Sequence, residues 1–158
     1  MSSLAPRFLG KLALGLGCLV YAGLAIGSAL DRMSERAPQI LPVVPQAMAS
    51  HALRGQSRAL ILAGKPRDAL GLAEAAVRNA PLNPASTGLL GAARLGAGDL
   101  AGAERAFRVA GQLGWREAFT QTYWLDRALR VGDYRVAAMR LDALLRQKPA
   151  LLNERRLM

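Results

Sequence analysis

The chain has 158 residues, enough for one domain with a hydrophobic core, and its formal net charge is +10. Alanine, leucine, glycine and arginine dominate and only 5% of the residues are aromatic, which favours helix and argues against a sheet protein. The single cysteine, Cys18, excludes an intrachain disulfide.

An apolar helix over about residues 8–30 is the first predicted element, within a membrane anchor of residues 1–36. Residues 12–30 carry no charge, and at a rise of about 1.5 Å per residue they can span a hydrocarbon core about 30 Å thick. Arg7 and Lys11 precede this stretch, whereas the charges that follow it nearly cancel. The bias predicts a single-pass protein of a bacterial inner membrane, with a cytoplasmic N-terminus and a periplasmic C-terminal domain.

A cleaved signal peptide is the alternative, because Gly27-Ser28-Ala29 resembles a small-x-small cleavage site. The apolar stretch exceeds the usual signal-peptide core of about 7–15 residues, so we favour an uncleaved anchor. Gly23 and Gly27 form a G-x-x-x-G pair, which lets two helix backbones approach closely. Association through the transmembrane helix is therefore a further hypothesis, although glycine is common in membrane helices.

A proline-rich linker is predicted at residues 37–48, where Pro38, Pro42 and Pro45 oppose helix formation. Prolines at this spacing favour an extended, semi-rigid segment. We therefore expect the linker to hold the following domain a short distance from the bilayer.

Beyond the linker the pattern predicts helices alone, separated by breaks that contain glycine or proline. The expected helix pairs are 49–63 with 67–79, 85–97 with 101–112, and 118–131 with 135–147, followed by a short helical segment at 149–158.

Three glycines set a period in this region. Gly64, Gly98 and Gly132 follow one another at intervals of 34 residues, and each suits the left-handed turn that ends a helix. A small residue stands five positions after each glycine: Ala69, Ala103 and Ala137. Seventeen positions after the glycines stand Pro81, Trp115 and Pro149.

This pattern resembles the tetratricopeptide repeat over residues 49–149. The resemblance implies an all-α chain in which a short solenoid of helix–turn–helix repeats follows the membrane helix. The repeats would occupy residues 49–82, 83–116 and 117–150, with a capping segment at 150–158. Trp115 stands where the family has proline, so we expect an altered exit loop after the second repeat.

The resemblance also implies that the first helices of the repeats line a concave groove. Its middle would be formed by small residues such as Gly88 and Ala92, while its ends would carry charge and bulk. The end residues are His51, Arg54 and Arg58 in the first repeat and Phe119, Thr122, Asp126 and Arg130 in the third. Such a groove suits a peptide or helix with an acidic group. The alternative is that these are ordinary solvated helix faces.

Aromatic residues gather at Trp115, Phe119, Tyr123 and Trp124. One interpretation is that they fill the space between the second and third repeats. The other is that they form an exposed aromatic anchor for a partner, for which Trp115, Tyr123 and Trp124 are the candidates.

No catalytic residue, metal site or cofactor is predicted, and the chain is not expected to be an enzyme. His51 is the only histidine, and the chain has no phosphate loop, nucleophile motif or Cys/His cluster. The pattern instead indicates a membrane-anchored scaffold for protein–protein interactions in the cell envelope, such as in polysaccharide assembly or export.

Two alternatives remain open. The chain could be an accessory subunit held in a membrane complex through its transmembrane helix. It could also bind an anionic polymer, because residues 49–158 carry 17 basic and 9 acidic groups. The arginines are scattered rather than clustered, so coding bias explains the charge better and nucleic acid is not an expected partner.

Overall fold

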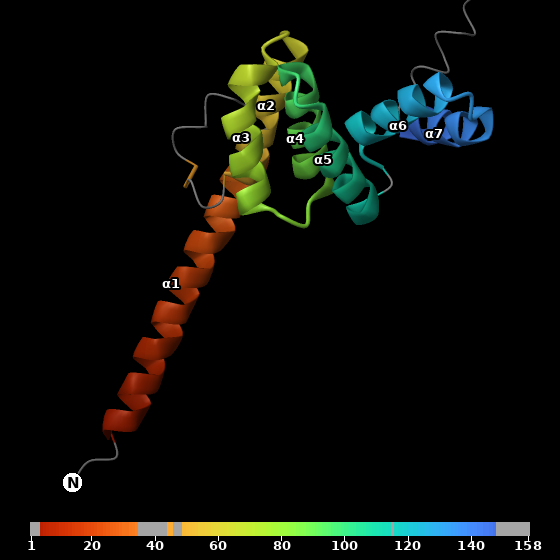
Figure 1. The fold of residues 1–158 in the computed structure, drawn as a ribbon. Helices are drawn as coiled ribbons and strands as arrows, with labels where there is room; N and C mark the ends of the chain where they lie inside the picture. Colours follow the sequence, from red (N-terminus) through yellow and green to blue (C-terminus); the bar gives the residue numbers. More distant parts are fainter. Residues whose placement is uncertain (1–3, 35–43, 46–48, 115, 148–158) are drawn as a thin grey trace, which may run out of the picture. The chain divides into compact units, whose positions relative to one another are not determined.

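The computed structural model describes residues 4–34, 44–45, 49–114 and 116–147. Within these residues the chain forms seven helices and no strand, which confirms the all-α class (Figure 1). The chain divides into two compact units, residues 1–52 and residues 53–158. Helix α2 begins in the first unit and continues in the second.

Helix α1 runs from Leu4 to Ser34 and is longer at both ends than the predicted 8–30. Its part from Gly10 to Ser34 is long and apolar enough to cross a membrane, by length and composition. Large apolar side chains between Leu12 and Ile26 are more than half exposed. A long helix with exposed apolar residues on all sides is typical of a segment surrounded by lipid.

Asp31, near the end of α1, caps the start of α2 (Ser50–Leu62). Only 3% of Asp31 is exposed. Its carboxylate accepts hydrogen bonds from the backbone N–H groups of His51 and Ala52, each at 3.0 Å, and from the Ser50 hydroxyl at 3.2 Å. The first amides of a helix have no acceptor within the helix, so Asp31 supplies one from outside.

The linker predicted at residues 37–48 lies outside the described residues except for residues 44 and 45, and it stays a prediction. Asp31 and Ser50 are within hydrogen-bonding distance, so the end of α1 lies beside the start of α2. Pro38 and Pro42 lie outside the described residues, and Pro45 is exposed.

The second unit continues with helix pairs. Each of the six helices after α1 begins and ends within one residue of its predicted bounds, and the predicted segment 149–158 lies outside the described residues. After α2 these helices are α3 (Pro66–Asn79), α4 (Pro84–Ala97), α5 (Leu100–Leu113), α6 (Ala118–Arg130) and α7 (Tyr134–Gln147).

The three periodic glycines end α2, α4 and α6 in the left-handed conformation. Their φ angles are 72° at Gly64, 93° at Gly98 and 76° at Gly132. After Gly98 and Gly132 comes an aspartate that caps the next helix, with Asp99 accepting from the Gly102 amide at 2.8 Å and Asp133 from the Val136 amide at 3.0 Å. Identical turn chemistry therefore joins the helices of these pairs.

The core of the second unit is built on α4, which packs closely on both α3 and α5. Two glycines permit this approach: a Cβ at Gly91 would lie 2.8 Å from the Phe107 ring, and a Cβ at Gly96 would lie 2.6 Å from Pro66. Phe107 is 1% exposed, and Ala69 is fully buried. The helices from α3 to α5 therefore pack without room for larger side chains at these contacts.

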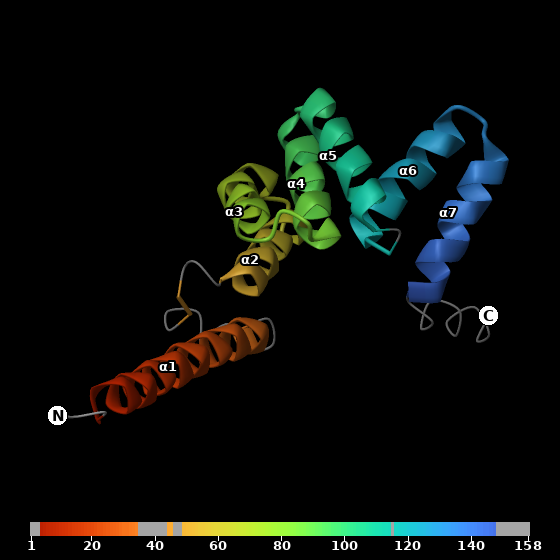
Figure 2. The ribbon, with the colours of Figure 1, turned by 90° about the horizontal axis from the view of Figure 1, so that it is seen from below.

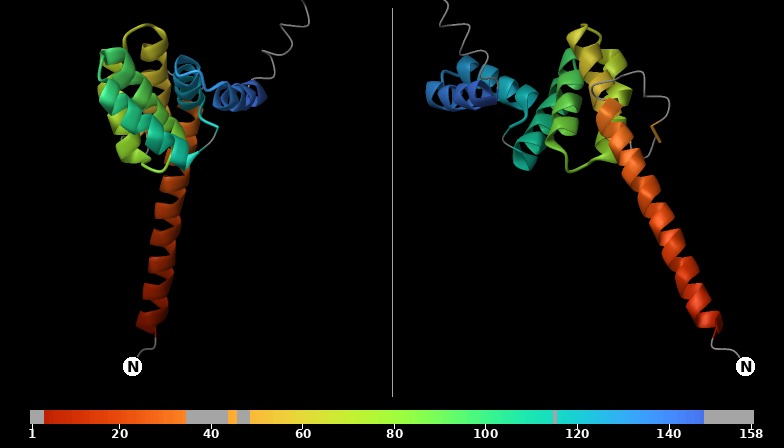
Figure 3. Two further views of the ribbon diagram at one scale, coloured as in Figure 1. Left: turned by 45° about the vertical axis from the view of Figure 1, so that its right-hand side comes forward. Right: turned by 180° about the vertical axis from the view of Figure 1, so that it is seen from behind.

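The α6–α7 hairpin packs less extensively on the preceding helices. Figures 2 and 3 show α6 starting beside α5 and then diverging from it. Ala137 is buried as its position in the period predicts, but Leu141, the counterpart of Phe107, is 46% exposed. The residue nine positions after the glycine is therefore buried in the second repeat but not in the third.

A candidate partner-binding cleft between α5 and α6

The divergence of α6 from α5 opens a cleft of about 500 Å³. Its walls come from the end of α4, the start of α5 and the C-terminal half of α6. The lining residues are Leu95, Leu100, Ala101, Glu104, Tyr123, Asp126, Arg127 and Arg130.

The cleft opens where one close contact of the preceding helices is replaced by a pair of bulky residues. Pro66 meets Gly96 where α3 packs on α4. Thirty-four residues later, the corresponding positions on α5 and α6 are Leu100 and Arg130. A leucine and an arginine cannot approach as a proline and a glycine do, so α5 and α6 stay apart at this end.

At the other end α6 is held firmly by Glu117. This side chain is 8% exposed, and its carboxylate accepts from the Phe119 amide at 3.1 Å and from the Thr120 amide and hydroxyl at 2.6 Å each. Glu117 lies so close to Gly88 of α4 that a methyl group there would overlap it. The first turn of α6 is thus fixed to α4, while its last turns leave the cleft open.

The floor of the cleft is apolar and reachable. Leu100 is 66% exposed and Leu95 is 39% exposed. Tyr123 is half-buried because its ring stacks on Phe107, with centroids 4.3 Å apart. These side chains leave apolar surface that a second molecule can cover.

The rim of the cleft is charged. Glu104 contacts Arg108 at 2.9 Å and Arg127 at 3.8 Å, and Asp126 Oδ2 lies 2.8 Å from Arg130 Nε. The hydrogen bond and the charge of Asp126 raise the pKa of Arg130 above its usual value, so this guanidinium stays charged. Among the lining residues, Arg127 and Arg130 are balanced by Glu104 and Asp126, so the rim is charged but neutral overall.

The predicted groove residues fall into separate places. Arg58 of α2 lies over the Phe119 ring of α6, with its guanidinium carbon 5.8 Å from the ring centroid. Asp126 and Arg130 form an i,i+4 pair and belong to the cleft. Thr122 is exposed, and its hydroxyl donates to the Ala118 carbonyl of the same helix at 2.9 Å.

Arg54, His51 and Gly88 are also predicted to line the groove, and the structure places them in three different environments. Arg54 is half-buried on α2, and His51 belongs to the first unit, where its backbone N–H bonds Asp31. Gly88, expected in the smooth middle of the groove, is buried under Glu117 instead. The physical reason is that the Glu117 cap needs a site without a side chain on α4.

The aromatic residues serve mainly as packing between α5 and α6. Trp124 stands edge-on to Tyr123 with centroids 5.1 Å apart, and its indole N–H donates to the Phe107 carbonyl at 3.5 Å. Tyr123 has one face on Phe107 and also lines the cleft. Trp115 lies outside the described residues.

The two glycines of the apolar helix differ in exposure. Gly23 is exposed with nothing within 4 Å of a Cβ built on it, whereas Gly27 is buried. Association of a second helix through this pair stays a prediction.

Sequence reasoning did not single out Leu100, Arg127 or Glu117. Leu100 and Tyr134 each follow an aspartate cap, and they are 66% and 73% exposed. An apolar residue directly after such a cap is therefore a sequence signal for exposed apolar surface. Glu117 is difficult to recognise as a helix cap from the sequence, because Ser, Thr, Asp and Asn are the usual caps.

No family model, no curated protein and no solved structure matches this chain. Among the described residues, no three His, Cys, Asp or Glu side chains gather in a way that could hold a metal ion.

Proposed function

We propose that this chain is a membrane-anchored interaction module of the tetratricopeptide type, and that the α5/α6 cleft binds an amphipathic helix of a partner protein. One observation carries the proposal: Leu95 and Leu100 are exposed in an open cleft whose opposite wall is a helix. Apolar surface in a concave site is the usual basis for helix-in-groove recognition.

The geometry suits a helix as the ligand. The cleft lies between two helices that diverge, and a third helix can fill such a gap by placing apolar side chains at i, i+3 and i+4 against both walls. The rim carries charges of both signs, with Arg127 and Arg130 against Glu104 and Asp126. Charged residues of both signs flanking the apolar stripe of the partner would complement it.

The location is part of the proposal. The apolar part of α1, which follows Arg7 and Lys11 in the same helix, supports an anchor in a bacterial inner membrane with the N-terminus in the cytoplasm. The helix pairs would then face the periplasm, where the chain would organise an envelope complex such as one for polysaccharide assembly or export.

Site-specific photocrosslinking in native membranes tests the binding site. A photoreactive phenylalanine analogue at Leu100 should give one discrete adduct, whose partner peptide lies on the apolar face of a helix. The same analogue at Leu82, which is 80% exposed and lies outside the cleft, is the matched control. Adducts that are identical at both positions, or only uncrosslinked monomer at Leu100, would contradict the proposal.

A further inference from the structure

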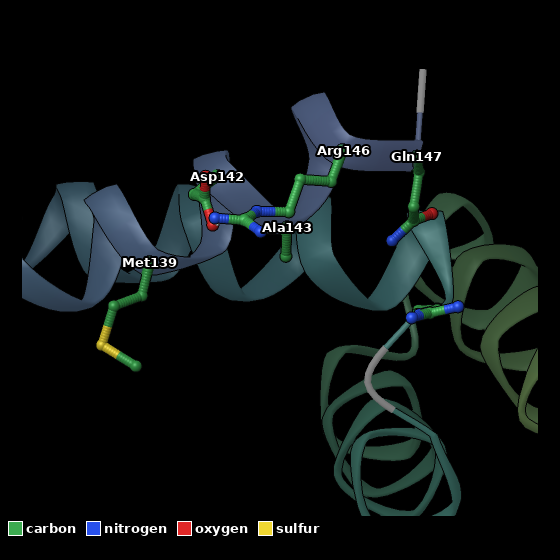
Figure 4. Close-up of a pocket in the computed structure, with 6 residues that line it drawn as sticks. Met139, Asp142, Ala143, Arg146 and Gln147 are labelled. Carbon is green, nitrogen blue, oxygen red and sulfur yellow. Dashed lines mark hydrogen bonds and ion pairs between the residues drawn. The ribbon is translucent and has the colours of Figure 1, made fainter. Parts of the chain in front are cut away.

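A second hollow lies against α7 and shares no residue with the α5/α6 cleft (Figure 4). Its volume is about 460 Å³. The lining residues are Arg116, Met139, Asp142, Ala143, Arg146 and Gln147. Five of them come from one side of α7, and Arg116 comes from the segment that precedes α6.

The hollow carries one positive charge that no acid in it balances. Arg146 Nε lies 2.8 Å from Asp142 Oδ2, so these two groups compensate each other. Arg116 is exposed, and within the described part of the chain it has no ion pair. A guanidinium in this state is available to an anion.

A buried donor lies in the same hollow. The amide nitrogen of Gln147 is hidden from solvent and has no hydrogen-bond partner among the described residues. Buried amide groups are nearly always hydrogen-bonded, because an unsatisfied donor costs the free energy of its lost hydration. In Figure 4 this nitrogen lies on the side of the Gln147 side chain that faces Ala143. An acceptor placed in the hollow would satisfy it.

We propose that this hollow binds a carboxylate group, with Arg116 compensating its charge and the Gln147 amide donating to one of its oxygens. One uncompensated positive charge matches a monoanion better than a doubly charged phosphate. Met139 and Ala143 provide apolar walls for the methylene groups that carry the carboxylate. The carboxylate can come from an acidic side chain of a bound peptide or from a free small acid. The inference is independent of the α5/α6 cleft.

Nuclear magnetic resonance of the full chain in detergent micelles tests this site. The probes are an acetylated, amidated peptide with a central Leu-Glu, its Leu-Gln counterpart, and free butyrate, a monoanion. We expect the Glu peptide to shift the Gln147 side-chain amide signal saturably and the Gln peptide to bind about tenfold more weakly or worse. Tighter binding of the peptide than of butyrate assigns the carboxylate to a protein ligand, and the reverse assigns it to a free acid.

Variants make the assignment specific. R116A and Q147L should each weaken binding about tenfold, because each removes one contact to the anion. R135A removes an exposed arginine of α7 outside the hollow and should leave binding unchanged.

Three results would overturn the proposal. The first is equal binding of the Glu and Gln peptides. The second is displacement of the Glu peptide by inorganic phosphate at lower concentrations than by butyrate. The third is an E154Q variant that, without any probe, shifts the Gln147 amide signal as R116A does, since the acceptor would then belong to the chain itself.

Discussion

The helices from α3 to α5 and the α6–α7 hairpin share their turn chemistry but not their packing. Gly98 and Gly132 end α4 and α6 in the same left-handed conformation. Yet Gly91 and Gly96 bring α4 into close contact with its neighbours, whereas Leu125 and Arg130 stand at the corresponding positions of α6. Turn residues therefore determine the hairpin, and small residues at the contact positions determine how closely hairpins stack.

The largest effect on the free energy of unfolding is expected at Phe107, and Leu141 is the equivalent position for comparison. Phe107→Ala should lower the free energy of unfolding by about 3–5 kcal/mol, because Phe107 is 1% exposed in the α4–α5 packing. Leu141→Ala should cost less than about 1 kcal/mol, since Leu141 is 46% exposed. Urea unfolding of the full chain in detergent, followed by circular dichroism, measures both. Equal losses would mean that the two hairpins pack alike.

A second substitution tests why one interface is closed and the other open. Gly96→Arg introduces into α4 the residue that α6 has at Arg130. A side chain at Gly96 would overlap Pro66, so the free energy of unfolding should fall by about 2 kcal/mol. Arg130→Ala, in the same urea assay, should change stability by no more than about 0.5 kcal/mol, since it removes only an exposed i,i+4 pair. A neutral Gly96→Arg would refute this explanation of the cleft.

The attachment of α6 should depend on Glu117. Glu117→Ala removes a buried cap with three hydrogen bonds, and we expect a loss of about 1–2 kcal/mol. Hydrogen exchange at the Phe119 and Thr120 amides should rise more than exchange at the Gly102 amide, which Asp99 caps independently. Uniformly raised exchange along α5 and α6 would instead indicate global destabilisation.

The smallest effect on stability is expected in the cleft itself. Leu100→Ser replaces a residue that is 66% exposed, so the free energy of unfolding should change by no more than about 0.5 kcal/mol. Binding of a partner helix in the proposed cleft should nevertheless weaken about tenfold, since an apolar anchor is lost. Copurification from native membranes compares Leu100→Ser with the control Leu82→Ser. Undiminished copurification with Leu100→Ser would place the partner elsewhere.

Helix bounds were predictable because their signals are local. Gly64 ends one helix and Pro66 starts the next, and Pro84 starts another after its asparagine cap. These residues act in this way whatever surrounds them. Contacts between helices were less predictable, because they depend on pairs of residues distant in the chain. The period of 34 residues shows that Arg130 is the counterpart of Gly96 in the next repeat. Only the structure shows that Gly96 contacts Pro66.

The residues of the α5/α6 cleft were also only partly predictable from the sequence. Tyr123, Asp126 and Arg130 were expected on a binding surface and they line the cleft. The sequence could not indicate that Glu117 would occupy the space above Gly88, since that contact depends on where α6 begins relative to α4. The capping role of Asp31 could not be predicted either. The amides that it caps, those of His51 and Ala52, are about twenty residues further along the chain.

The Asp31 hydrogen bonds hold the end of α1 against the start of α2, so an insertion between residues 31 and 50 lies in a stretch of chain that is closed at both ends. The entropy of closing such a loop grows only slowly with its length, by about 0.6 kcal/mol for each doubling. A short epitope or fluorescent reporter inserted there should therefore leave the Asp31 hydrogen bonds to α2 in place. A label can therefore be introduced between α1 and α2 at little cost to the free energy of folding.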